Sequence, residues 1–316
     1  MACKAKGIIL KKISVIIPAY NCSQFLDDAL KSVINQNLED FEVIVVDDGS
    51  NQIESAACWN IIKSYPHTKL LTKCNGGAAS ARNFGAKSAA GEYLAFLDSD
   101  DVWLEGKIQS QLDKIDKDPT IGLMLGNIIV VDEQLNAKYR ATKHLPDEKK
   151  LAIEHFFLGK IVMNTPTILV RKKIFDSVGG FPEDLIYRED HYFLMKVTQA
   201  SRIISDDTYL TLRRERPGSL SSVKDVVTEF GKHSPFWTKS SHEFNFLNVN
   251  YAKVNLIIKL FVYYLRNNRQ EDIKETINYS GTIGAKYRIM FTLLSKMSWM
   301  VNLIYKLRSS MHNARI

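Results

Sequence analysis

The chain has 316 residues, of which 45% are hydrophobic and 24% charged, a composition that is typical of a folded globular protein and excludes disorder throughout the chain. Its formal net charge is +7, and residues 251–316 alone hold eleven Lys and Arg against three Asp and Glu. The first 250 residues are therefore close to neutral. A basic C-terminal region indicates either an anionic partner, such as a membrane surface or nucleic acid, or a well-solvated helical face.

The cysteines and the apolar stretches indicate where the protein works. Cys3, Cys22, Cys58 and Cys74 form no C-x-x-C pair, which argues against a structural zinc site or a disulfide framework and favours a reducing compartment. The apolar stretch near the start is too short for a signal peptide, and no apolar run approaches the ~20 residues of a spanning helix. We expect a cytoplasmic protein, either free or peripheral on the inner face of the cytoplasmic membrane.

The first 130 residues alternate between apolar, β-branched runs and amphipathic helical patterns. Strands are predicted at 13–18, 41–46, 69–72 and 92–97, and helices at 23–35, 56–65 and 77–90. Runs that are apolar throughout are typical of strands buried on both faces. The alternation predicts an α/β fold with a parallel, doubly wound sheet.

The alternation weakens further along the chain. The remaining predicted elements are, in order, a strand at 121–131, a polar loop at 138–150, a short helix at 151–158, a strand at 167–170, a helix at 189–199 and short edge strands at 203–204 and 209–212. From about residue 235 onward the pattern is helical, and the chain has no internal repeat.

Polar clusters follow three of the predicted strands, where ligands bind in such sheets, so these clusters should converge on one crevice. The densest is Asp98-Ser99-Asp100-Asp101. Carboxylates this close resist ionising together unless a cation neutralises them, and a hard divalent ion, Mg²⁺ or Mn²⁺, meets that need. The alternative is a helix N-cap, with Asp101 preceding a helix from residue 102.

Other residues suit the same crevice. Asp48 can accept hydrogen bonds from a base or a ribose, although a turn that caps the next helix explains it equally well. The small-residue loop before Arg82 allows a close approach to the backbone at Gly76, and Arg82 adds a forked positive charge that suits a diphosphate or a neighbouring carboxylate. Glu189 and Asp190 open a helix, where they serve either as favourable N-terminal carboxylates or as a general base.

Four stretches, taken in order, carry a family resemblance. They are SVIIPAYN at 14–21, FEVIVVDDGS at 41–50, NGGAASARNFGAKSAAGEYLAFLDSDDVW at 75–103 and GGFPEDLIYRED at 179–190. Their order and spacing resemble family 2 of the inverting glycosyltransferases, which have the GT-A fold, and among these the bacterial surface-polysaccharide enzymes. The resemblance covers residues 12–222 and implies a mainly parallel, twisted sheet flanked by helices, plus a C-terminal helical extension.

The resemblance also implies a division of the chain. Residues 1–130 would be the nucleotide-sugar-binding half of the GT-A domain, and residues 131–235 its acceptor and catalytic half. Residues 236–316 would form a basic, amphipathic helical region.

Roles for individual residues follow from the resemblance. The residues expected at the nucleotide-sugar site are Pro18, Ala19, Tyr20, Asp48, Gly76, Arg82, Asp98, Ser99 and Arg216. Asp98 would approach the ribose or sugar and share a metal with Asp100. Relatives often carry His where Arg216 stands, so Arg216 is expected to act through its charge.

The implied reaction is the transfer of a sugar, from a donor expected to be UDP-linked, to a hydroxyl of a glycan or lipid-linked acceptor. Asp190 would take the proton from that hydroxyl, with Glu189 beside it. Mn²⁺ or Mg²⁺ on Asp100 would offset the charge that grows on the leaving diphosphate. A single displacement inverts the anomeric configuration.

Other functions fit less well. A nucleotidyltransferase or an NAD-dependent dehydrogenase needs a Gly-rich loop after the first strand, where this chain has Pro18-Ala19-Tyr20-Asn21. A catalytically silent nucleotide-sugar-binding or scaffold module of a polysaccharide assembly complex remains the alternative. No recognised nucleic-acid-binding module accompanies the basic region, so no nucleic acid partner is expected.

The basic region itself has an amphipathic stripe. Apolar residues from Met290 to Leu307 recur at helical spacing, with Lys and Arg on either side. Such a helix can lie in the headgroup region of an anionic membrane. The alternative is that these helices pack on the catalytic domain.

Overall fold

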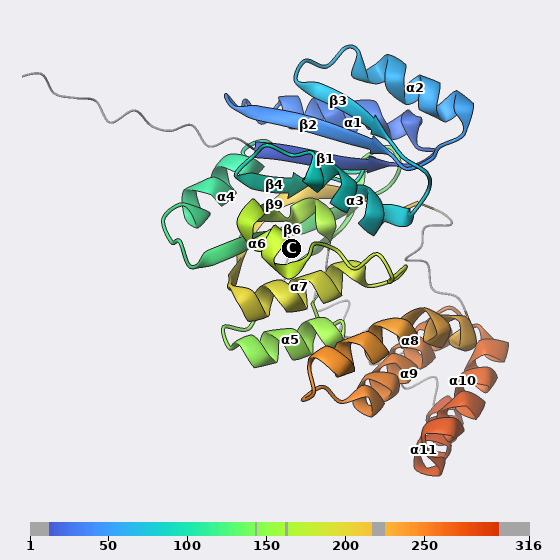
Figure 1. Cartoon of the computed structure of the whole chain (residues 1–316). Coiled ribbons are helices and arrows are strands. Elements are labelled where there is room, and N and C mark those ends of the chain that lie inside the picture. Colours follow the sequence, from blue (N-terminus) through green and yellow to red (C-terminus); the bar gives the residue numbers. More distant parts are fainter. Residues whose placement is uncertain (1–12, 143, 162–163, 217–224, 297–316) are drawn as a thin grey trace, which may run out of the picture. The chain divides into compact units, whose positions relative to one another are not determined.

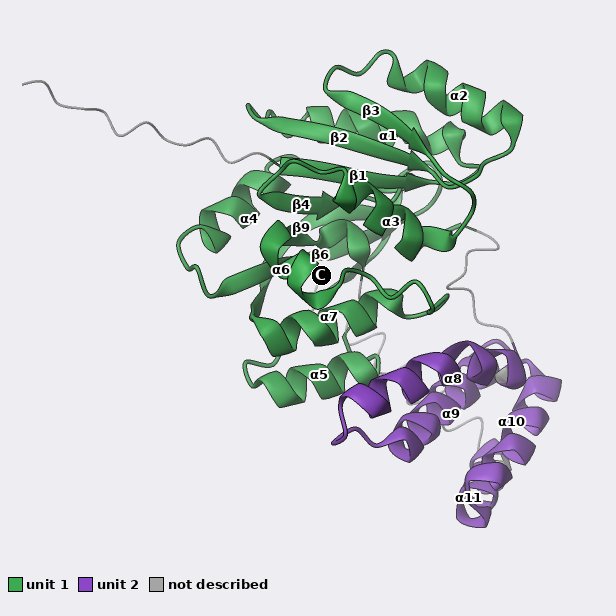
Figure 2. Cartoon of the chain, viewed as in Figure 1, with its two compact units in different colours: residues 1–219 green, residues 220–316 purple. Residues whose placement is uncertain are grey.

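The computed structural model describes residues 13–142, 144–161, 164–216 and 225–296. Two compact units are distinguished, residues 1–219 and residues 220–316 (Figure 2). The boundary predicted at 235/236 falls inside helix α8 (Val226–Glu243). The helix begins well before Pro235 because the Asp225 carboxylate accepts a hydrogen bond from the Thr228 amide at 2.8 Å and caps its first turn. A division of the first unit at 130/131 stays a prediction.

A single sheet organises the first unit (Figure 1). Its strand order is β3-β2-β1-β4-β8-β6-β9-β5, and β7 pairs with β6. The pairs among β1 to β4 and the pair β6–β9 are parallel, while β8 is antiparallel to both of its neighbours. The strands are β1 (Ile13–Ala19), β2 (Phe41–Asp47), β3 (Thr68–Thr72), β4 (Tyr93–Phe96), β5 (Val102–Trp103), β6 (Ile121–Val131), β7 (Ala137–Ala141), β8 (Leu169–Arg171) and β9 (Arg202–Arg214).

Helices cover both faces of this sheet, with α3 and α6 in front of it and α1 behind it in Figure 1. The helices of the unit are α1 (Ser23–Ile34), α2 (Gln52–Ile62), α3 (Gly77–Lys87), α4 (Lys107–Ile115), α5 (Lys149–Phe157), α6 (Lys172–Val178) and α7 (Glu189–Ala200), with a 3₁₀ turn, η1 (Thr165–Thr167). The central strands are mostly apolar, as expected of strands that are covered on both faces, and the predicted α/β sheet is confirmed.

Alternate residues of β1 face opposite helical layers. Val15 and Ile17 belong to a core shared with α1, α2 and α4. Ile16 faces α3, and its Cγ2 lies only 2.7 Å from where a Cβ on Gly85 would stand. On this second face a ring cluster joins β4 to α6 and α7, and its members are Phe96, Phe175, Phe181 and Phe193.

Two predictions about the later strands are wrong. The region predicted as a polar loop at 138–150 contains β7, a largely exposed strand whose polar side chains give no apolar alternation. The two edge strands predicted at 203–204 and 209–212 are one strand, β9, which pairs with β6 on one side and, at Thr211 and Leu212, with β5 on the other. Asp206 interrupts its apolar pattern, yet this carboxylate is buried and bonded to Ser110 (2.6 Å) and Lys114 (2.9 Å) of α4.

The second unit consists of helices in the part that the structure describes. They are α8, α9 (Val249–Arg266), α10 (Gln270–Ile283) and α11 (Ala285–Lys296). Buried rings, among them Phe230, Trp237 and Tyr264, form its core. None of the described helices is long and apolar enough to cross a membrane. The predicted stripe continues beyond Met297, outside the described residues.

Candidate functional site

The candidate site lies where β1, β2 and β4 end. The parallel register aligns Ala19 with Asp47 and Ile16 with Phe96. The residues that follow these strands therefore lie along one edge of the sheet, as predicted. The Ala19 carbonyl also accepts a hydrogen bond from the Asp48 amide at 2.9 Å, which ties the first two strand ends together.

The loops beyond β1 and β2 are linked by a residue that sequence reasoning missed. Asn21 has a positive φ of 47°, and its side-chain oxygen accepts hydrogen bonds from Asn51, whose side chain in turn caps α2. Of the residues predicted to line the nucleotide pocket, Pro18 is half-buried, Ala19 is buried and Tyr20 is exposed. The aromatic ring of Tyr20 is therefore exposed to solvent at the strand ends.

The Asp48 carboxylate organises the loop that enters α3. It accepts hydrogen bonds from the amides of Gly76 (3.1 Å) and Gly77 (2.8 Å) and from Lys73 Nζ (2.8 Å). Gly77 has a φ of +85°, which glycine adopts without strain. The predicted contact of Asp48 with a base stays a prediction, because in this structure the carboxylate is bonded to the chain itself.

Arg82 joins the two groups of carboxylates that the sequence singles out. Its guanidinium is 2.7 Å from Asp98 Oδ1 and 3.1 Å from Glu189 Oε1, and its side chain is only 5% exposed. A planar guanidinium suits two such partners because its N–H groups are fixed in a fork. One buried cation from α3 therefore holds together the end of β4 and the start of α7.

The neighbouring Asn83 fixes the turn that precedes α7. Its side-chain oxygen accepts a hydrogen bond from the Phe181 amide (2.9 Å), and its nitrogen donates one to the Phe181 carbonyl (2.8 Å). Gly180 has a φ of +71°, and a Cβ there would lie 2.6 Å from Asn83 Oδ1. The glycines at 179–180 thus allow the turn to approach α3 closely.

Glu189 and Asp190 occupy the first turn of α7, where the helix dipole favours negative charge. Asp190 Oδ1 accepts a hydrogen bond from the His191 amide at 2.7 Å and lies 2.8 Å from His191 Nδ1. Burial, reinforced by the charge of Asp190, raises the pKa of Glu189 although Arg82 opposes this. Burial by itself would raise the pKa of Asp190 as well. The interactions with His191 have the larger effect, and the pKa of that carboxyl is lowered. Asp190 is consequently the more readily ionised of the two.

The members of the Asp98–Asp101 cluster point to different partners. Asp98 pairs with Arg82, and Asp100 Oδ2 is 2.5 Å from a guanidinium nitrogen of Arg216. The buried Ser99 hydroxyl lies 2.8 Å from the Cys22 sulfur, so its predicted role toward a donor stays a prediction.

Asp101 is not a helix cap. Residues 102–103 form β5, and the next helix, α4, begins only at Lys107. The Asp101 carboxylate is buried and accepts a hydrogen bond from the Arg214 amide at 2.8 Å. Burial, together with the charges of Asp100 and Asp98, raises the pKa of Asp101 well above its ordinary value. It anchors β9 against the loop that carries Asp98 and Asp100.

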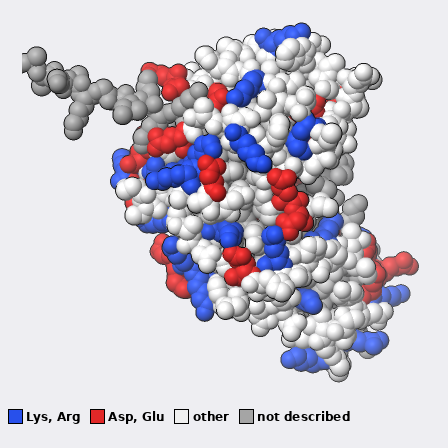
Figure 3. Space-filling model, viewed as in Figure 1, with Lys and Arg blue, Asp and Glu red and all other residues white. Residues whose placement is uncertain are grey.

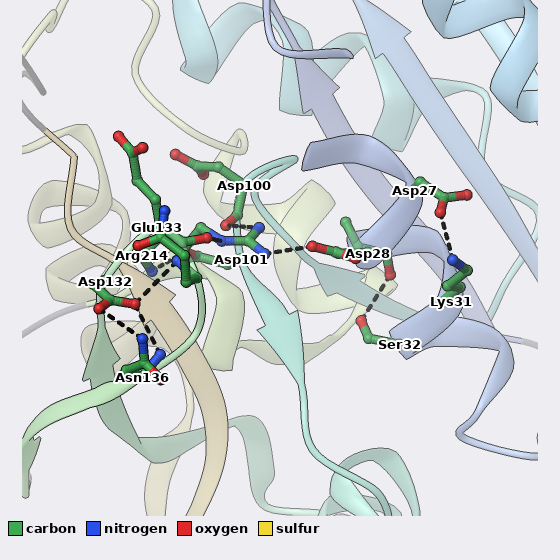
Figure 4. Close-up of polar contacts among 12 residues, drawn as sticks. Asp27, Asp28, Lys31, Ser32, Asp100, Asp101, Asp132, Glu133, Asn136 and Arg214 are labelled. Carbon is green, nitrogen blue, oxygen red and sulfur yellow. Dashed lines mark hydrogen bonds and ion pairs between the residues drawn. The ribbon is translucent and has the colours of Figure 1, made fainter. Parts of the chain in front are cut away.

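Arg214 is a second anchor that the sequence did not single out from its arginine-rich surroundings. Figure 4 shows its side chain reaching from β9 toward Asp28 of α1. The guanidinium donates to the Asp100 carbonyl (2.9 Å) and the Glu133 carbonyl (3.2 Å), and it pairs with Asp28 at 2.5 Å. These bonds fix the backbone of Asp100.

Asp98 and Asp100 are the two carboxylates that could hold a divalent cation. Mg²⁺ is commonly held by one or two carboxylates together with substrate phosphates, and Asp98 and Asp100 supply that number. Burial and the charge of Asp98 raise the pKa of Asp100 although Arg216 opposes this. Within the described ranges no three His, Cys, Asp or Glu side chains form a metal-holding group.

Comparisons with known proteins identify relatives of the chain. The family model described as Glycosyl transferase family 2 matches residues 14–179. An uncharacterized glycosyltransferase of Haemophilus influenzae is 29% identical over 228 residues, which are 70% of this chain and 74% of that protein. An uncharacterized glycosyltransferase of Rickettsia felis is 29% identical over 245 residues, which are 76% of this chain but 40% of that protein.

A solved structure, S. aureus TarS 1–349 in complex with UDP-GlcNAc, has a similar fold. The TM-score is 0.61 at 22% sequence identity, and the match covers 86% of this chain and 80% of that one. The likeness shows the GT-A arrangement of a mainly parallel sheet with flanking helices. Because the family model matches more than half of the residues, the chain belongs to glycosyl transferase family 2.

Proposed function

We propose that the chain transfers a sugar from a nucleotide-sugar donor to an acceptor hydroxyl, with inversion at the anomeric carbon and with Asp190 as the general base. The observation that carries the proposal is the Arg82 guanidinium, which binds Asp98 at 2.7 Å and Glu189 at 3.1 Å. This ion-pair network brings Asp190, the residue next to Glu189, close to the end of β4, where ligands of such sheets bind.

The donor site would be formed by the loops beyond β1, β2 and β4. Tyr20, Asp98 and Arg216 are among the members of the predicted set that are not buried, and they would contact the donor directly. Asp48 and Gly76 would shape the nucleotide pocket through the loop that they fix. A UDP-linked donor is the preferred choice, because the structural neighbour TarS is described in complex with UDP-GlcNAc.

Asp190 is suited to the role of base. Its interactions with His191 hold it as a carboxylate and fix one of its oxygens. Asp190 would accept the proton of the acceptor hydroxyl while that oxygen attacks the anomeric carbon. The bond from that carbon to the nucleoside diphosphate breaks on the opposite side, so one displacement inverts the configuration and no covalent enzyme intermediate forms.

Asp100, together with Asp98, would hold Mn²⁺ or Mg²⁺. When bound, such an ion offsets the negative charge that develops on the leaving diphosphate. The protein prepares this place by fixing the Asp100 backbone through Arg214 and the loop through Asp101.

The acceptor would be a glycan or a lipid-linked saccharide, met in the cytoplasm or at the inner face of its membrane. The second unit supports a membrane role, because α11 leaves Ile289 and Leu293 63% and 57% exposed. Lys286 and Arg288 are exposed on the same helix. Residues 220–316 hold fourteen Lys and Arg against six Asp and Glu, which favours an anionic lipid surface.

The donor assignment is tested by a thermal-shift screen of UDP-, GDP- and dTDP-sugars with Mn²⁺ or Mg²⁺. A cognate donor binds the folded state and raises its melting temperature. We expect a UDP-sugar to do so with metal in the wild type and to lose most of the metal-dependent effect in Asp100→Ala. A shift that is the same in both proteins contradicts the metal assignment, and the absence of any shift with every donor contradicts the donor site.

A further inference from the structure

Two arginines at the end of β9 differ in how they are held. Arg214 is 1% exposed and donates to two backbone carbonyls as well as to Asp28. Arg216 is 33% exposed, and its described contacts are the Asp100 carboxylate at 2.5 Å and the face of the Phe25 ring at 5.2 Å. Arg214 is therefore a fixed part of the fold, whereas Arg216 can leave Asp100 without breaking a backbone hydrogen bond to any residue that the structure describes.

The Arg216–Asp100 ion pair uses a carboxylate that a divalent cation would need. Asp100 Oδ2 is the atom in contact with the guanidinium, and a divalent ion bound to the same carboxylate would be repelled by the positive charge beside it, so the two cations compete for Asp100. A nucleoside diphosphate offers Arg216 a different anionic partner, whose geometry suits the guanidinium fork. The nucleotide can therefore release the carboxylate.

We propose that Arg216 is the counter-cation of Asp100 in the donor-free protein and that it moves to the diphosphate when the nucleotide binds. Divalent-cation binding and nucleotide binding are then positively coupled, because each depends on the same guanidinium leaving Asp100. The coupling must be reciprocal, so metal tightens the nucleotide by the same factor by which the nucleotide tightens the metal. The inference rests on the proposed donor site and adds a coupling between the two ligands that bind there.

The test is a Mn²⁺ titration followed by electron paramagnetic resonance, which detects free Mn²⁺, with and without UDP. We expect Arg216→Ala to bind Mn²⁺ without UDP at least about fivefold more tightly than the wild type, since couplings of this kind span roughly 5–150-fold. Addition of UDP should then tighten Mn²⁺ binding less in Arg216→Ala than in the wild type. Arg216→Lys, which keeps the charge, should lie between the two.

Lys138→Ala is the matched control. It also removes one positive charge close to this end of β9, since Lys138 pairs with Glu215 at 2.9 Å, but it leaves the Asp100 ion pair in place. Its Mn²⁺ affinity should equal that of the wild type. An increase in affinity as large as in Arg216→Ala would overturn the inference, because the loss of any nearby positive charge would then explain the effect.

Two further outcomes separate this inference from the proposed function. If UDP promotes Mn²⁺ binding equally in the wild type and in Arg216→Ala, the counter-cation role is wrong while the donor site stands. If neither protein binds Mn²⁺ with UDP present, and Asp100→Asn behaves in the same way, the metal site itself is wrong and the inference falls with it.

Discussion

At the scale of single residues, the site depends on Arg82. The sequence predicted that Arg82 would support a diphosphate or a neighbouring carboxylate, and the structure shows it bound to Asp98 and Glu189 at once. The second partner could not be predicted, because Glu189 lies more than a hundred residues away and only the packing of α7 brings it near. His191 was missed for a similar reason, since a lone histidine carries no signal until its contact with Asp190 is seen.

Replacing Arg82 with methionine should destabilise the fold as well as the site. The change leaves two carboxylates without their cation, and because both are only partly buried we expect a loss of about 2–3 kcal/mol in unfolding free energy. The matched control is Arg202→Met, which breaks an exposed pair with Asp118 and should cost less than about 1 kcal/mol. Urea unfolding of both variants measures the difference, and equal losses would contradict the role given to Arg82.

Glu189 should make stability depend on pH. Its folded pKa is raised, so its contribution is complete below its unfolded pKa of about 4.3 and is lost as the pH rises through the folded value. Glu189→Gln should therefore flatten the decline in unfolding free energy between pH 5 and pH 8. Parallel pH profiles of the wild type and the variant, measured by urea unfolding, would show that Glu189 has no raised pKa.

At the scale of elements, the sequence predicted the strands of the first half of the sheet nearly to their ends, because buried parallel strands leave clear apolar runs. The helix predicted at 56–65 begins earlier, as α2, because Asn51 caps it. It failed where tertiary contacts override the local pattern. β9 continues through Asp206 because α4 supplies partners for that carboxylate. The helix predicted after Asp101 is replaced by β5 because two residues there pair with β9.

The fit of α3 on the sheet can be tested with one substitution made at two places. In Gly85→Ala the new Cβ meets Ile16 at 2.7 Å, so the cost of overpacking, about 1–3 kcal/mol, should exceed the helix propensity gained. In Gly231→Ala, inside α8, nothing lies within 4 Å of the new Cβ, and stability should rise by about 0.5–1 kcal/mol. Hydrogen exchange measures the protection of the backbone amides in each helix separately. Greater protection of α3 in Gly85→Ala than in the wild type would refute the packing described.

At the scale of the whole molecule, the two units differ in net charge. On the face drawn in Figure 3, acidic and basic side chains are interspersed. The surplus of positive charge belongs to residues 220–316, and this was evident from the sequence. The start of the helical unit was not evident from the sequence. Pro235 resembles a helix boundary, although it lies in the middle of α8, which begins after its N-cap residue Asp225.

Membrane binding should depend on the exposed apolar side chains of α11. The double variant Ile289→Ser, Leu293→Ser should be recovered less with floating vesicles of phosphatidylglycerol and phosphatidylcholine than the wild type, because it removes apolar area from the basic helix. Ile53→Ser, at an 82% exposed position on α2, is the control and should float like the wild type. Equal recovery of all three proteins would argue against a membrane surface on α11.

The role of Asp190 as the base of a glycosyl transfer is tested most directly by the rate at which nucleoside diphosphate is released. The assay uses the donor that raises the melting temperature, together with a hydroxyl acceptor. Asp190→Asn should retain the donor-dependent thermal shift of the wild type while its release rate falls by about 10²–10⁴-fold, the usual contribution of a general base. A variant that binds donor and still turns over at the wild-type rate would contradict the assignment.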